Sequence, residues 1–102
     1  MDKMVYYAIN GDKVFFASFY FDTVQLFTDN ATDILLYTIA EKYHLDINDP
    51  VEYERIKSYS ISEYPEFKIY SVFLNTLLQN KQIQSPEGYI NSNEILDELY
   101  ND

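Results

Sequence analysis

Near the start of the chain, two apolar stretches are joined by the dipeptide Asn10-Gly11. In a β-strand, side chains alternate between two faces, and Asn-Gly is the preferred pair of a two-residue type I′ turn. We therefore predict a hairpin in which Tyr7 lies opposite Val14. The outer face of this hairpin would carry Tyr6, Ala8, Lys13, Phe15, Ala17 and Phe19.

Residues 58–76 have a similar rhythm, so they predict a second hairpin with strands around Tyr59 and over Phe67–Phe73. The helix starts match as well, because NATDIL at residues 30–35 resembles NSNEIL at residues 91–96. In this alignment the second copy contains two insertions, one in the turn SEYPE and one in KQIQSPEG. Surface turns tolerate such insertions, so we interpret the chain as an internal duplication.

These patterns predict an α+β fold in one compact domain, residues 1–102. It would consist of two tandem strand–strand–helix repeats at about residues 4–43 and 55–100, with antiparallel hairpins and helices packed on one face. Asp49-Pro50 also predicts the start of a short helix through Arg55, because Asp is a good N-cap and Pro fits the first helical turn. In an alternative assignment, residues 65–79 form one helix, since several apolar residues fall at helical spacing. The β-branched and aromatic content of Phe67–Phe73 favours a strand.

Charge narrows the classes of partner. The formal net charge is −10, and one arginine and six lysines are scattered singly along the chain. Binding to phosphates needs clustered cations, so we expect no nucleic-acid partner. An anionic membrane surface would repel the chain, and no apolar run approaches the length of a membrane span. We find no signal peptide and expect a cytoplasmic protein.

Candidate catalytic and metal-binding chemistry is sparse. There is no cysteine, and the single histidine, His44, is predicted at a helix end. The segment DIND resembles the start of a calcium loop, but Val51 and Lys57 occupy the positions that require Gly and Glu. Gly11 and Gly88 are the only glycines, and they form no phosphate-binding loop. We therefore expect no metal, no cofactor and no enzymatic activity.

The aromatic content is the unusual feature, with eleven tyrosines and seven phenylalanines. The outer face of the first hairpin is too apolar for a solvent-exposed surface, so a helix of the same chain, a second copy or a partner should cover it. We predict partner-binding residues at Tyr6, Phe15, Phe19 and Tyr70.

Two functional hypotheses follow. The first is a non-enzymatic interaction module that binds a protein or peptide, either in the groove between the repeats or on an aromatic sheet face. Packing of two half-domains about a pseudo-twofold axis is also compatible with a homodimer. The alternative is an acidic protein that imitates the charge of DNA and inhibits a nucleic-acid-binding enzyme of the host.

In its size, its tyrosine and isoleucine content, its lack of cysteine and its degenerate repeat, the chain resembles the small orphan proteins of filamentous viruses that infect hyperthermophilic archaea (the Acidianus filamentous virus type). This resemblance implies a virus-encoded protein that acts in the cytoplasm of the host cell. It assigns no activity and no functional residue. The eight asparagines depart from the composition typical of thermophiles, and they leave a bacteriophage origin open.

Overall fold

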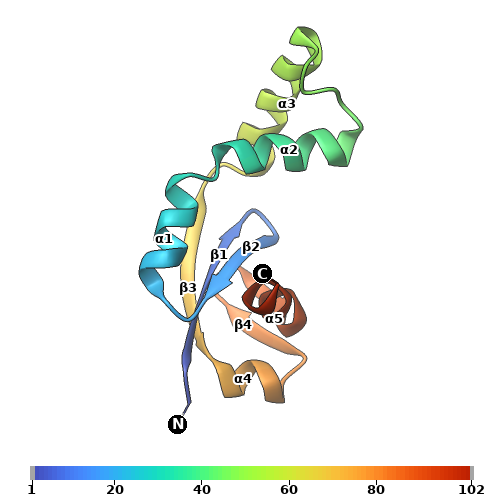
Figure 1. Ribbon diagram of the computed structural model, residues 1–102. Helices are drawn as coiled ribbons and strands as arrows, with labels where there is room; N and C mark the ends of the chain where they lie inside the picture. The colour runs from blue at the N-terminus through green and yellow to red at the C-terminus, as the bar shows by residue number, and fades with distance from the viewer. Residues whose placement is uncertain (1, 102) are drawn as a thin grey trace.

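The computed structural model describes residues 2–101 and shows an α+β fold (Figure 1). Its elements, in chain order, are β1 (Met4–Asn10), β2 (Lys13–Ser18), α1 (Phe21–Asp29), α2 (Thr32–Tyr43), α3 (Pro50–Glu63), β3 (Phe67–Phe73), α4 (Leu74–Gln79), β4 (Gln82–Ser85), β5 (Gly88–Asn91) and α5 (Ser92–Tyr100). The predicted α+β class is therefore confirmed.

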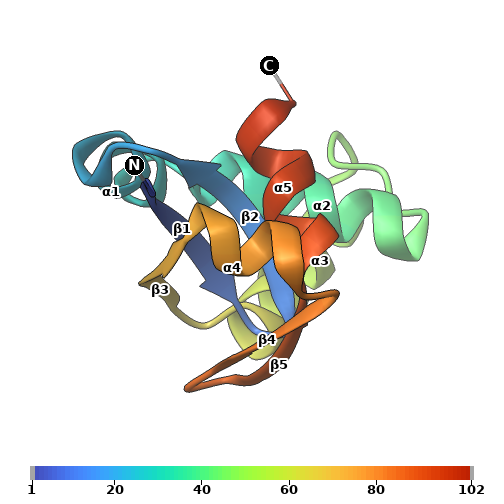
Figure 2. The same cartoon turned by 90° about the horizontal axis from the view of Figure 1, so that it is seen from below.

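A three-stranded antiparallel sheet of order β2-β1-β3 organises the fold, and β4 and β5 form a separate two-stranded ribbon. The ribbon, α4 and α5 pack on one face of the sheet, where Val5, Tyr7 and Ile9 of β1 join Ile83, Ile90 and Ile95 in the main core. On the opposite face, Phe27 of α1 stacks on Phe16 at a centroid distance of 4.6 Å. Figure 2 shows α1 and α5 on opposite sides of the strands.

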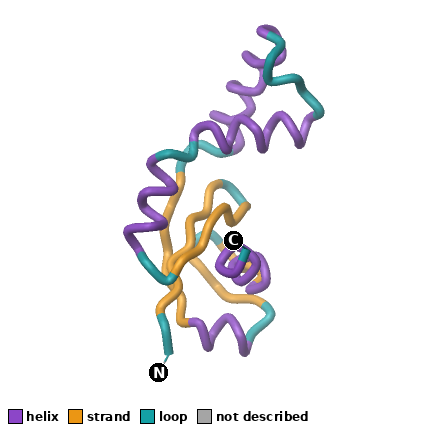
Figure 3. Tube along the Cα trace, in the orientation of Figure 1, coloured by secondary structure: helices purple, strands orange, loops and turns teal. Residues whose placement is uncertain are grey.

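Helices α2 and α3 form an extension beyond the sheet (Figure 3) and make the molecule elongated, with extents of 51 × 24 × 22 Å. Their ends are joined by an ion pair of 2.5 Å between Lys42 and Glu63. Beside this pair, Tyr43 stacks on Tyr59 at 4.4 Å between ring centroids. A second core cluster lies between these helices and the sheet and contains Phe15, Leu35, Ile39, Ile56 and Tyr64.

The first hairpin forms, but its register differs from the prediction. Asn10 pairs with Lys13 and Ile9 with Val14, so the turn residues are Gly11-Asp12. Only Gly11 of this turn has a positive φ, +62°, which excludes a type I′ turn. A bulge then leaves Phe15 as an extra residue, because Ile9 pairs with Val14 and Ala8 with Phe16. Residues beyond Ser18 leave the sheet, since α1 begins at Phe21.

The order strand–strand–helix does occur twice, as β1-β2-α1 and β4-β5-α5, but the second hairpin lies elsewhere than predicted. Residues 58–62 belong to α3, and the stretch KQIQSPEG, interpreted as an insertion, contains β4 and the following turn. Helix α3 begins as expected, with Asp49 accepting a hydrogen bond from the Val51 N–H at 2.9 Å, but it continues to Glu63. The alternation at residues 58–62 is misleading because Ile61 is 74% exposed, whereas the fully buried residue is Ile56.

The assignment of Phe67–Phe73 to a strand is confirmed, and the alternative single helix over residues 65–79 is wrong. The chain changes from β3 to α4 at Leu74 without an intervening loop. Two further helix ends agree with the sequence. His44 ends α2 with a left-handed φ of 55°, and Asn91 caps α5 by accepting the Asn93 N–H at 2.9 Å.

Candidate functional site

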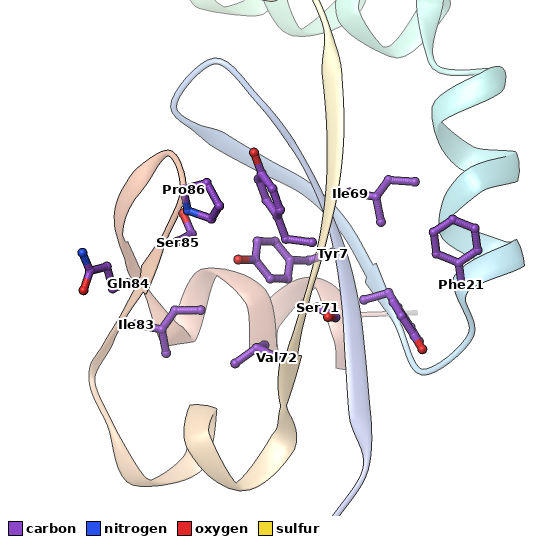
Figure 4. Close-up of a pocket in the computed structure, with 11 residues that line it drawn as sticks. Tyr7, Phe21, Ile69, Ser71, Val72, Ile83, Gln84, Ser85 and Pro86 are labelled. Carbon is purple, nitrogen blue, oxygen red and sulfur yellow. The ribbon is translucent and has the colours of Figure 1, made fainter.

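A groove of about 430 Å³ runs along strand β3 (Figure 4). Helix α1 lies on one side of it and the tip of the β4–β5 ribbon on the other, with β3 between them. Its lining residues are Tyr6, Tyr7, Phe21, Ile69, Tyr70, Ser71, Val72, Ile83, Gln84, Ser85 and Pro86.

Strand β3 is an edge of the sheet, and the register shows which of its backbone groups face outward. The Leu74 N–H donates to the Lys3 carbonyl at 2.8 Å, just beyond the paired residues Met4 and Phe73. In antiparallel pairs, hydrogen-bonded and non-hydrogen-bonded residues alternate. Val72 and Tyr70 therefore bond to β1. The N–H and C=O groups of Ile69 and Ser71 point away from β1, into the groove.

The α1 side of the groove is apolar and aromatic. Tyr6 pairs with Ser71 across the two strands and therefore lies on the same sheet face. The ring of Tyr6 meets the ring of Phe21 edge-to-face, at 5.7 Å between centroids. Phe21 remains 46% exposed, so part of its ring is available to a ligand. Ile69 extends this surface along β3.

The ribbon side of the groove contributes the polar side chains Gln84 and Ser85 beside Ile83 and Pro86, and one carboxylate tethers the ribbon to β3. Glu87, in the β4–β5 turn, accepts from Lys68 Nζ at 2.8 Å and from the Tyr70 hydroxyl at 2.7 Å, both at Oε1. The turn itself is fixed by Ser85, whose Oγ donates to the Gly88 carbonyl at 3.0 Å and accepts the Glu87 N–H at 3.2 Å. These contacts hold the tip of the ribbon beside β3.

This tether also sets the charges of the site. Hydrogen bonding to Lys68 and then to Tyr70 lowers the pKa of Glu87, and the bond to Glu87 raises the pKa of Lys68. The pKa of Tyr70 is raised chiefly by its hydrogen bond to Glu87. Deeper in the groove, burial raises the pKa of Tyr7. At neutral pH the ribbon side therefore holds an ionised Glu87, a protonated Lys68 and neutral tyrosines.

The groove offers backbone hydrogen-bonding groups along β3 and an apolar surface on its α1 side. Within residues 2–101, no three His, Cys, Asp or Glu side chains come together as a candidate metal site. No helix in this part of the chain is long and apolar enough to cross a membrane. The arrangement is suited to binding an extended chain through backbone groups and shallow apolar contacts.

The fold places two of the four predicted partner-binding residues in the groove and the other two outside it. Tyr6 and Tyr70 both line the groove, from β1 and β3 respectively. Phe15 is only 7% exposed and lies between Tyr64 and Phe67, at 5.4 Å from each ring. Phe19 is half-buried against the main core and meets Tyr100 at 6.5 Å. A segment of the same chain therefore covers Phe15.

Sequence reasoning missed Phe21 and Pro86. Phe21 begins α1 and lies beyond the predicted outer face of the hairpin, which ends at Phe19. Pro86 lies in the segment interpreted as an insertion, which forms the ribbon turn instead. The signal that identifies this turn is the pair Pro86 and Gly88 between two short segments that each contain one buried isoleucine, with Gly88 at φ +109°.

Comparison with known proteins gives no further assignment: no family model, no curated protein and no solved structure matches this chain.

Proposed function

We propose that this chain is a non-enzymatic protein–protein interaction module that binds an extended segment of another protein by adding it as a strand to the free edge of β3. The observation that carries the proposal is the open edge itself, which lies in a groove between α1 and the ribbon tip. The virus-encoded origin and cytoplasmic location implied by the sequence resemblance belong to the same proposal.

The backbone of β3 supplies the general part of the affinity. Ile69 and Ser71 each present one N–H donor and one C=O acceptor to the groove, so an added strand gains ladder hydrogen bonds at both residues. Each such bond contributes about 0.5–1.5 kcal/mol net. The exposed part of Phe21, together with Tyr6 and Ile69, adds apolar contact. The backbone bonds therefore supply a moderate affinity that does not depend on the side chains of the ligand, and contacts with ligand side chains add to it.

The two edges of the sheet differ in how they are protected. Edge strands are commonly blunted by proline, by several charges or by an overlying element. At the other edge, α5 packs along β2 (Figure 2). Strand β3 contains no proline, and its one charged side chain, Lys68, is paired with Glu87. Of the two edges of this sheet, β3 is therefore the less protected.

Selection from a display library of random ten-residue peptides, followed by binding measurements on the enriched peptides, tests this function. The variant Ser71→Pro removes an outward N–H and should abolish binding, while Leu78→Ser, on the exposed surface of α4, should leave it unchanged. Hydrogen exchange of the Ile69 and Ser71 amides should slow in the complex. Enriched peptides that bind Ser71→Pro as tightly as the wild type would overturn the proposal.

A further inference from the structure

We infer that the segment received by β3 is basic: an extended strand with apolar side chains on the α1 side and lysine or arginine on the ribbon side, beside Glu87. This inference rests on the proposed function and adds the chemistry of the partner.

Strand geometry fixes which ligand side chains face which wall. Residues directly opposite each other in a sheet point to the same face, and the direction alternates along the strand. Ligand residues opposite Ile69 and Ser71 therefore point to the α1 side. The ligand residue opposite Tyr70 points to the ribbon side, where Gln84, Ser85 and the Glu87 tether lie.

The α1 side selects apolar side chains. Tyr6, Phe21 and Ile69 line it, and Phe21 leaves nearly half of its surface uncovered. A valine or isoleucine opposite Ile69 would cover this ring and remove apolar surface from water. A charged side chain in the same place would lose hydration without gaining a partner.

The ribbon side selects cations. Both Lys68 and Tyr70 contact Oε1 of Glu87, and within residues 2–101 Oε2 of the same carboxylate makes no hydrogen bond or ion pair. Glu66 lines a smaller cavity of about 170 Å³ together with Lys68 and Glu87. Two carboxylates therefore face a single lysine, and a cation from the ligand would balance the second negative charge.

The net charge of the chain acts in the same direction. At −10, the protein attracts basic segments from a distance and accelerates their association. The same charge opposes the other plausible occupant, a second copy of this chain. Pairing two copies through β3 would bring together two chains of −10 each and align two Glu66–Glu87 regions.

Three fluorescein-labelled nine-residue peptides test the inference. All three alternate valine with a second residue, which is lysine, glutamine or glutamate, and their binding is measured by fluorescence anisotropy at two salt concentrations. We expect affinity to fall in the order lysine, glutamine, glutamate. Glu87→Gln should reduce the preference for lysine over glutamate by about two- to fivefold, the range expected for one exposed ion pair.

The variant Lys68→Met separates charge recognition from the tether. It also breaks the Lys68–Glu87 pair, but it leaves the carboxylate free, so the preference for lysine should increase. If the pair acts only as a structural tether, both variants should weaken all three peptides equally, and the inference is overturned.

The remaining outcomes distinguish the inference from the function on which it rests. Equal affinity for the three peptides, lost in Ser71→Pro, overturns the basic partner and supports strand addition. A lysine preference that persists in Ser71→Pro indicates diffuse attraction to an acidic surface and overturns both. A dimer in size-exclusion chromatography that becomes a monomer in Ser71→Pro identifies the second copy as the occupant and also overturns the inference.

Discussion

Proline placed at two neighbouring positions of β3 should lower stability strongly at one position and hardly at the other. The Val72 N–H belongs to the hydrogen-bonded pair with Val5, whereas the Ser71 N–H points into the groove. Proline lacks this donor, and it is tolerated on an edge strand only where the N–H faces away from the sheet. The same substitution, moved by one residue, therefore tests the direction of the edge.

The expected loss of stability in each variant follows from the hydrogen bonds and packing that the substitution removes. Val72→Pro removes a ladder hydrogen bond and places the ring against β1, and leaving the partner carbonyl unsatisfied should lower the free energy of unfolding by at least about 1–3 kcal/mol. Val72 also packs against the main core, so Val72→Ala measures the side-chain part of this loss. Ser71→Pro loses no intramolecular bond, because the Ser71 N–H faces away from β1 and the side chain is exposed, so it should cost much less than Val72→Pro.

Urea denaturation followed by circular dichroism provides the measurement, since the free energy of unfolding falls linearly with urea. We expect the midpoint of Ser71→Pro to stay near that of the wild type, and the midpoint of Val72→Pro to lie well below that of Val72→Ala. If Ser71→Pro is the more destabilised proline variant, Ser71 donates to β1. The groove would then lack the free groups on which strand addition depends.

Three other outcomes follow from the structure. Phe15→Ala should lower the free energy of unfolding by about 3–5 kcal/mol because the ring is buried. Phe21→Ala should weaken peptide binding with a smaller loss of stability, because Phe21 is partly exposed. Equal decreases in melting temperature would contradict the assignment of Phe15 to the core and Phe21 to the groove. Gly11→Ala should destabilise the protein more than Gly11→Asn. In both variants the added Cβ lies 2.7 Å from the Glu63 carbonyl at the end of α3, but asparagine tolerates the φ of +62° better. Unchanged urea midpoints would show that the end of α3 moves to accommodate the Cβ. The pKa of Glu87 is lowered in the folded state, so its contribution to stability is present above the usual glutamate pKa of about 4.3 and is lost as pH falls through the folded pKa. The pKa of Lys68 is raised, so its contribution is lost only as pH rises through its folded pKa. The stability of Glu87→Gln should therefore lack the loss at acid pH that the wild type shows.

Local signals in the sequence predicted local structure well. Asp49-Pro50 marked the start of α3, His44 the end of α2, and the β-branched and aromatic residues of Phe67–Phe73 marked a strand. The turn at Gly11 was misplaced by one residue because Asn10 belongs to β1, where it pairs with Lys13 on one side and with Phe67 on the other. A separate bulge at Phe15 shifts the register once more. That bulge directs Phe15 toward Tyr64 at a distant helix end, a contact that no short-range pattern encodes.

The groove was less accessible to sequence reasoning because its walls come from distant parts of the chain. Tyr6 and Tyr70 were identified through their place on predicted strand faces, and both line the groove. The opposite wall depends on Pro86 in a ribbon of four-residue strands, which is too short for a clear periodic signal. The edge itself exists only because β1 selects β3 as its second neighbour.

This choice of neighbour has a consequence for folding. Asn10 pairs with Phe67, so the sheet closes only after all of α1, α2 and α3 has been looped out between the two strands. Contacts so far apart in sequence carry a large loop-closure entropy and form slowly. We expect β1 to pair first with β2, exposing the apolar edge from Val5 to Ile9 until β3 arrives. An incompletely folded chain would therefore expose the edge of β1, which is more apolar than the β3 edge of the native protein. The risk of aggregation would be greatest in the time before β3 pairs with β1.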